Sequence, residues 1–153
     1  MTVQRLSHLG ICVTDLERSL AFYRDGLGFR EVGRLDVTGP EASTLLEIPD
    51  VSLRAIYLER DGTRIELLHY ATTQRSSDTP LPMDRPGLTH FSFRVSNLDA
   101  TLAAIEKAGG TLLPHTRIDN PRFNAHAAFA LDPDGTRLEL VQTPGDSNAL
   151  PGQ

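Results

Sequence analysis

Cysteine and long apolar runs are scarce in this chain of 153 residues, and each scarcity excludes a class of protein. The single cysteine, Cys12, cannot form an intrachain disulfide or supply a zinc site made of cysteine thiolates. No apolar run approaches the roughly 20 residues that a membrane-spanning helix requires, so a membrane is not an expected partner. The first residues lack the apolar segment of a secretory signal peptide. We therefore expect a cytoplasmic protein.

Positive charge is scarce as well. The chain has 15 lysines and arginines against 20 aspartates and glutamates, which gives a net charge of −5 at neutral pH. The arginines are scattered, whereas a nucleic-acid-binding domain usually carries a basic stripe, so nucleic acid is disfavoured as a partner. The apolar fraction of 39% is ordinary for a globular protein. The length fits one compact domain or two small modules that share a core.

The chain contains an internal repeat. The segment 134–140, Asp-Gly-Thr-Arg-Leu-Glu-Leu, follows a copy at 61–67 that differs only by isoleucine for leucine, 73 positions earlier (134 − 61 = 73). In each copy an Asp-Gly turn leads into alternating apolar and polar residues, which predicts the second strand of a β-hairpin. The alternation places Glu66 and Glu139 on the strand face opposite their apolar neighbours. A glutamate on a sheet face needs a partner or water.

The beginning of each half repeats too. Residues 6–13 and 88–95 each predict a strand, and His8 and His90 occupy equivalent positions on its less apolar face, 82 residues apart (90 − 8 = 82). A capping box from Thr14 to Glu17 predicts the start of the first helix. The two helices are predicted from apolar stripes that end at glycines: Leu16, Leu20, Tyr23 and Leu27 in the first copy, and Leu98, Leu102 and Ile105 in the second.

These patterns predict an α+β fold made by a tandem duplication of a strand–helix–strands module. Such a module cannot bury both faces of its sheet alone, so we expect the two copies to form one curved mixed sheet with helices on its convex face. The expected organisation is a single domain over 1–153, with module one at 5–70, a linker at 71–87, module two at 88–143 and a frayed tail at 144–153. Hairpins are expected at 51–59 with 63–70 and at 126–131 with 136–142, a further strand is expected at 29–35, and segment 36–49 is left unassigned.

By strand parity, the concave face of this sheet collects His8, Glu66, His90 and Glu139. A single strand histidine is more often structural than a ligand, and a strand glutamate is usually solvated. Both residue types recur in both copies, however, and two facing carboxylates would repel each other without a cation between them. Imidazole and carboxylate ligands without a thiolate accept Zn, Ni, Co, Mn, Fe or Mg. The sequence therefore predicts a site for one divalent metal ion.

The chain resembles the vicinal oxygen chelate superfamily, which includes glyoxalase I, methylmalonyl-CoA epimerase, extradiol dioxygenases and antibiotic resistance proteins. The resemblance covers about residues 5 to 143. It rests on His8, on Asp15 to Tyr23, on Leu27-Gly28-Phe29, on Ile65-Glu66-Leu67, on His90, and on Asp132-Pro133-Asp134-Gly135 through Glu139. It implies paired βαβββ modules, metal positions at His8, Glu66, His90 and Glu139, and a homodimer whose sites come from one chain or from two.

Within this superfamily the four ligands favour a glyoxalase-like or epimerase-like lyase or isomerase acting on a small oxygenated substrate. Such an enzyme removes an α-proton while the metal stabilises the enediolate or enolate. Glu139 is the first candidate for the base and Glu66 the second. An extradiol dioxygenase uses three ligands, matching His8, His90 and Glu139, and Glu66 would crowd such a site. A resistance protein that only binds a drug or metabolite often loses ligands, so it is the alternative class.

Against the epimerase comparison, the position beside the second histidine is Thr89 rather than a second histidine, and no elements that bind glutathione are recognisable. Further candidates for substrate binding are polar residues near the ends of the predicted strands: Arg94, His69, Tyr70, Arg122 and His126. The last two lie around a loop that could act as a lid. Cys12 is expected to be a small buried residue rather than a nucleophile.

Overall fold

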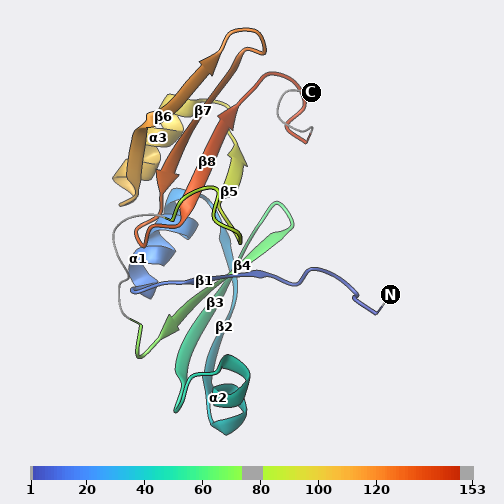
Figure 1. The fold of residues 1–153 in the computed structure, drawn as a ribbon, viewed down its shortest axis with the longest axis vertical. Helices are drawn as coiled ribbons and strands as arrows, with labels where there is room; N and C mark the ends of the chain where they lie inside the picture. Colours follow the sequence, from blue (N-terminus) through green and yellow to red (C-terminus); the bar gives the residue numbers. More distant parts are fainter. Residues whose placement is uncertain (1, 74–80, 149–153) are drawn as a thin grey trace. The chain divides into compact units, whose positions relative to one another are not determined.

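The computed structural model describes residues 2–73 and 81–148, which belong to two compact units, Met1–Ser76 and Ser77–Gln153. The first unit contains β1 (Leu9–Cys12), α1 (Leu16–Leu20), the π-helix η1 (Ala21–Gly26), β2 (Arg30–Thr38), α2 (Pro40–Leu46), β3 (Ser52–Arg60) and β4 (Thr63–Tyr70) (Figure 1). The second contains β5 (Phe91–Arg94), α3 (Leu98–Lys107), β6 (Thr111–Asn120), β7 (Ala125–Leu131) and β8 (Arg137–Gln142). Parts of the predicted linker (74–80) and tail (149–153) lie outside the described residues.

Each unit holds a four-stranded mixed sheet, in the orders β1-β4-β3-β2 and β5-β8-β7-β6. β1 is parallel to its neighbour β4, and β5 is parallel to its neighbour β8. All other neighbouring strands are antiparallel. The register is equivalent in both units, because Gly10 lies opposite Glu66 and Ser92 lies opposite Glu139. The α+β fold class and the duplication of the module are thus confirmed. That the two sheets share one concave face stays a prediction.

The two histidine strands are shorter than the sequence predicts. Residues 2–8 form an extended segment that leads into β1 at Leu9, and β5 begins only at Phe91 (Figure 1). Pairing with the parallel neighbour begins at Leu9 with Ile65 in the first unit and at Phe91 with Leu138 in the second. His8 and His90 therefore lie just before their strands, where no ladder fixes the backbone.

The helix starts are equivalent, but the predicted capping residue is wrong by one position. Asp15, not Thr14, is the N-cap of α1, and its carboxylate accepts a hydrogen bond of 3.0 Å from the backbone N–H of Arg18, which lowers the pKa of Asp15. The Thr14 hydroxyl instead accepts a hydrogen bond of 2.7 Å from the Arg18 guanidinium. In the second unit Asn97, the counterpart of Asp15, caps α3 by accepting from the backbone of Ala100.

The predicted helix stripes pack as expected, with one difference. Leu16, Leu20, Tyr23 and Leu27 are all at most 8% exposed, as are Leu98 and Ile105, whereas Leu102 is half-buried. The first helix is α-helical for five residues only and continues as the π-helix η1, which the periodicity did not indicate. Its end is confirmed at Gly28, whose positive φ of 71° favours glycine.

Segment 36–49, unassigned from the sequence, contains the end of β2 and the short helix α2. α2 buries none of its residues, which is why no apolar stripe indicated it. The hairpin between β3 and β4 turns at Asp61 and Gly62, both with positive φ, as the Asp-Gly pair predicts. β6 was also not predicted, since it is largely exposed and its register with β7 shifts between Leu113 and Ile118.

The apolar face of each sheet forms the core. The contribution of this core to stability can be measured at Leu67. Leu67 is fully buried and adjoins Glu66 in β4, whereas Leu45 in α2 is 82% exposed. We expect Leu67→Ala to lower the free energy of unfolding by about 2–5 kcal/mol. Leu45→Ala should change it by less than about 0.5 kcal/mol. Urea unfolding of both variants tests this, and equal destabilisation would contradict the core as described.

Candidate metal centre

The first unit pairs His8 with Glu66. The imidazole Nε2 lies 3.1 Å from the Glu66 carboxylate Oε2, and the two side chains are 34% and 11% exposed. Glu66 is in the middle of β4, with Gly10 on one side and Tyr57 on the other. The imidazole of His8, two residues before Gly10, approaches this carboxylate from the start of β1.

Two neighbours hold this pair. The Ser7 hydroxyl lies 3.1 Å from Nδ1 of His8, and the Tyr57 ring packs edge-on against the imidazole with centroids 5.4 Å apart. A hydrogen bond from Tyr57 to Glu66, more than burial of the phenol, raises the pKa of Tyr57 to about 12. The phenol therefore remains protonated and donates to the carboxylate at neutral pH.

The second unit repeats this arrangement. Nε2 of His90 lies 3.6 Å from Oε2 of Glu139, and the side chains are 29% and 30% exposed. The Thr89 hydroxyl lies 2.9 Å from Nδ1 of His90, and the Phe129 ring packs edge-on against the imidazole at 5.5 Å. The Ser92 hydroxyl donates a hydrogen bond of 2.7 Å to Oε2 of Glu139. The structure thus brings each predicted histidine to the predicted glutamate of its own unit.

This donor set fits a divalent cation. A histidine whose Nδ1–H donates to a hydroxyl keeps the lone pair of Nε2 available, which is the usual arrangement of a metal-bound imidazole. Both Nε2 atoms already lie beside a carboxylate oxygen. Within residues 2–73 and 81–148, no group of three or more His, Cys, Asp or Glu side chains could hold a metal ion. Each pair alone offers two of the four predicted ligands, and the sharing of one ion by the two pairs stays a prediction.

Two of the other predicted residues contact backbone carbonyls through their side chains, and a third is partly buried. The Arg94 guanidinium donates to the carbonyls of Thr143 and Pro144, at 3.2 and 2.8 Å. Nδ1 of His69 lies 3.2 Å from the carbonyl of Val13. Burial, as the main cause, raises the pKa of Tyr70. These contacts position the strand ends, and substrate binding by the three residues stays a prediction.

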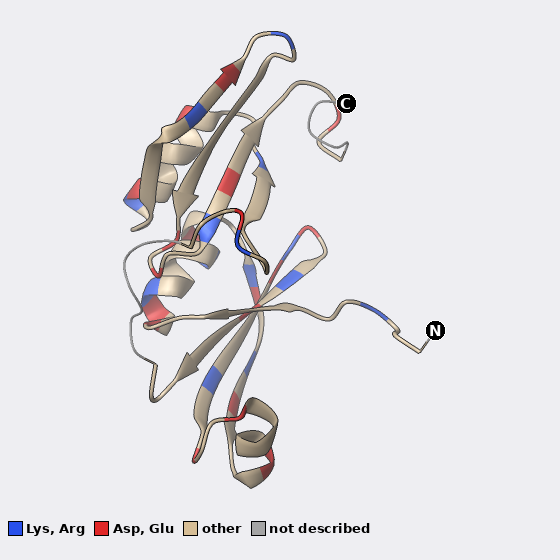
Figure 2. Cartoon of the chain, viewed as in Figure 1, with Lys and Arg blue, Asp and Glu red and all other residues tan. Residues whose placement is uncertain are grey.

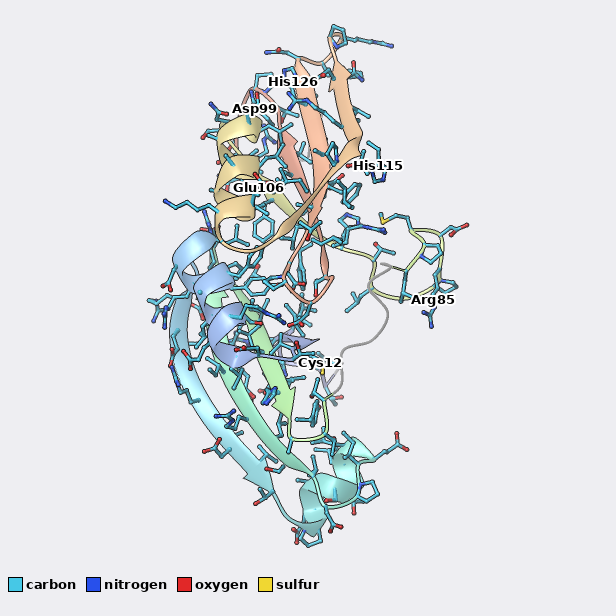
Figure 3. All side chains as sticks on the ribbon, turned by 90° about the vertical axis from the view of Figure 1, so that its left-hand side faces the viewer. Cys12, Arg85, Asp99, Glu106, His115 and His126 are labelled. Carbon is cyan, nitrogen blue, oxygen red and sulfur yellow. The ribbon has the colours of Figure 1, made fainter. Side chains whose placement is uncertain are left out.

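Arg122 lies in the turn between β6 and β7, and His126 lies near the start of β7. The Arg122 guanidinium lies over the Phe123 ring, 5.2 Å from its centroid. Nδ1 of His126 lies 2.5 Å from Asp119, and this hydrogen bond is the main cause that lowers the pKa of Asp119. Figure 3 shows His126 in the second unit. A role of this loop as a lid stays a prediction.

Four supporting residues were missed in the sequence. Ser7 and Thr89 had a usable signal, because a hydroxyl residue precedes each histidine at the repeat spacing (89 − 7 = 82). No signal in the sequence pointed to Tyr57 or Ser92, because the other module has no tyrosine or serine at the equivalent position. Only the pairing of the strands places each of them opposite a glutamate. The expected burial of Cys12 was wrong: the residue is exposed, because it lies on the face of the strand opposite Ile11 and Val13, which are buried.

Charged side chains of both signs occur in both units. Figure 2 shows lysine and arginine interspersed with aspartate and glutamate along the ribbons of both units. In the part of the chain that the structure describes, no helix combines the length and the apolar character needed to cross a bilayer.

Comparisons with known proteins agree on one family. Residues 5–140 match the model of the Glyoxalase/Bleomycin resistance protein/Dioxygenase superfamily. Over 147 residues the chain is 30% identical to an ethylmalonyl-CoA/methylmalonyl-CoA epimerase of Cereibacter sphaeroides, covering 92% of this chain and 98% of that protein. It is 30% identical over 148 residues to a lactoylglutathione lyase of Pseudomonas putida, covering 89% and 83%. A solved glyoxalase family protein from Bacillus cereus aligns with a TM-score of 0.79 over 95% of this chain and 97% of that one, and at 18% identity this is a similarity of fold.

Proposed function

Since the chain belongs to the Glyoxalase/Bleomycin resistance protein/Dioxygenase superfamily, we propose that it is a metal-dependent lyase or isomerase. The proposed reaction begins with removal of an α-proton from a small oxygenated substrate. The similarity to an epimerase and to a lactoylglutathione lyase supports this reaction type, because both names denote enzymes of these two classes.

The observation that carries the proposal is the repeated pair of imidazole and carboxylate. We propose that His8 and Glu66 join His90 and Glu139 on one divalent ion, with the second pair supplied by the same chain or by a second copy in a homodimer. Two imidazoles and two carboxylates leave two positions of an octahedral ion for water or substrate oxygens. When bound, the ion would stabilise the negative charge that forms on the substrate oxygen.

The protein residues then have distinct tasks. Glu139, the more exposed carboxylate at 30%, is proposed to take the α-proton, and Glu66, 11% exposed, is the second candidate. Ser7 and Thr89 would orient the imidazoles through Nδ1. Contacts to the substrate are proposed to come from the polar residues near the strand ends: His69, Tyr70, Arg94, Arg122 and His126.

Deuterium wash-in tests this function. The protein, loaded with one divalent metal at a time, is incubated in D₂O with a panel of 2-oxo compounds and acyl thioesters, and exchange at the α-carbon is followed by NMR. We expect exchange with at least one substrate, lost on chelation and restored by metal. Metal binding without exchange across the panel would instead favour a protein that binds a drug or metabolite without turnover.

A further inference from the structure

Among residues 2–73 and 81–148, the hydrogen-bond donor to Glu139 is a small side chain. The Ser92 hydroxyl, on the neighbouring parallel strand, donates to Oε2 at 2.7 Å. The neighbour on the other side is Phe129, which has no hydroxyl and packs edge-on against His90. The same Oε2 is the oxygen that lies nearest Nε2 of His90. This leaves Oε1 as the oxygen that can approach a substrate.

Glu66 is held from the opposite side. Its donor is Tyr57, on the antiparallel neighbour, and that ring is packed against His8. The position that corresponds to Ser92 is Gly10, where a Cβ would lie 3.1 Å from Leu68 Cδ1. A hydroxyl from β1 would therefore crowd Leu68, and Glu66 depends on the phenol instead.

This difference matters because a base must move during the reaction, whereas a fixed ligand need not. A serine hydroxyl turns about one bond and can follow a carboxylate as it shifts. The Tyr57 phenol cannot follow in this way, because its ring is packed against His8. Glu66 is also the more buried of the two carboxylates, at 11% exposure against 30% for Glu139.

We propose that Ser92 is a positioning residue for Glu139: its hydroxyl holds Oε2 so that Oε1 faces the α-proton, while Glu66 remains a fixed ligand. This inference rests on the proposed function, because it takes Glu139 as the base. Ser92 itself touches neither the metal ion nor the substrate in this account.

The test compares Ser92→Ala with Ser92→Thr, which keeps a hydroxyl and suits a strand. In the exchange assay with the most active substrate, Ser92→Ala should lower kcat about tenfold, since a hydrogen bond to a charged group is lost. KM and Co(II) affinity, measured by competition with a chelator, should change by no more than about twofold. Ser92→Thr should restore kcat to within about twofold of the wild-type value. Ser96→Ala, an exposed serine of the same unit, is the matched control and should change nothing.

Three results would overturn the inference. An unchanged kcat in Ser92→Ala, or a loss in Ser92→Thr as large as in Ser92→Ala, shows that the hydroxyl does not position the base. A fall in Co(II) affinity with unchanged kcat per bound metal shows that Ser92 supports metal binding by Glu139 rather than proton removal. If the wild-type protein exchanges no substrate, the proposed function itself fails; an active wild-type protein with unaffected serine variants rejects this inference alone.

Discussion

Glu139→Gln is expected to lower kcat for α-proton exchange by about 10²–10⁴, the range typical for loss of a general base or acid. Glutamine has almost the same shape and can still accept the hydrogen bond from Ser92, but its amide cannot take a proton. The fold should be kept, because the side chain is 30% exposed and lies on the sheet face opposite the core. Because Glu139 is also a proposed ligand, the rate must be expressed per bound metal ion.

The matched control for this change is Glu106→Gln. Glu106 is an exposed glutamate of α3 in the same unit (Figure 3). Its variant has the same change in charge and should keep the wild-type rate. Circular dichroism and urea unfolding of both variants separate loss of chemistry from loss of structure. Undiminished exchange in Glu139→Gln would reject Glu139 as the base, and Glu66→Gln would then be the next variant to measure.

The second large effect is expected from His8→Ala, measured as metal affinity. This variant removes one of four proposed ligands and leaves Glu66 without its imidazole neighbour. Affinity for Zn(II) or Co(II) should fall at least about 100-fold, because loss of even an outer partner of a ligand costs 10–100-fold. The fold should be unaffected, since His8 precedes β1 and is one-third exposed.

His115→Ala provides the comparison for this variant. His115 is an exposed histidine of β6 and was never assigned to the site (Figure 3). Competition titrations with a chromophoric chelator should give wild-type affinity for His115→Ala. Equal affinities of His8→Ala and the wild-type protein would remove His8 from the ligand set and leave the ion, if any, to other residues.

The sequence predicted those parts of the fold that depend on repetition and periodicity. The duplicated Asp-Gly hairpins and apolar helix stripes predicted the repeated strand–helix–strands module, but not the order of the strands in each sheet. It did not predict α2 or β6, because neither buries a regular apolar face. The cap was misplaced at Thr14 because threonine, aspartate and asparagine all cap helices, and only the backbone decides which residue reaches the free N–H groups.

The residues of the two histidine–glutamate pairs could be named from the sequence, whereas the residues that support them could not; metal binding by the pairs stays a prediction. Recurrence of histidine and glutamate at matching positions identified both pairs, and the structure places the partners of each pair within 3.6 Å. Tyr57 and Ser92 could not be found in this way, because their roles come from pairing between strands distant in sequence. Arg94 and His69 are predicted to bind substrate, and that prediction stays; the contacts of their side chains with backbone carbonyls could not be foreseen from their positions in the sequence.

The central claim is that two pairs of ligands combine on one ion, and metal stoichiometry tests it most directly. Titration with Co(II), followed by its d–d absorption and by metal analysis after gel filtration, should give a single class of tight site with one ion per chain. His8→Ala and His90→Ala should each abolish that same site. Two weak sites per chain, each removed by only one of these variants, or no bound ion at all, would contradict the claim.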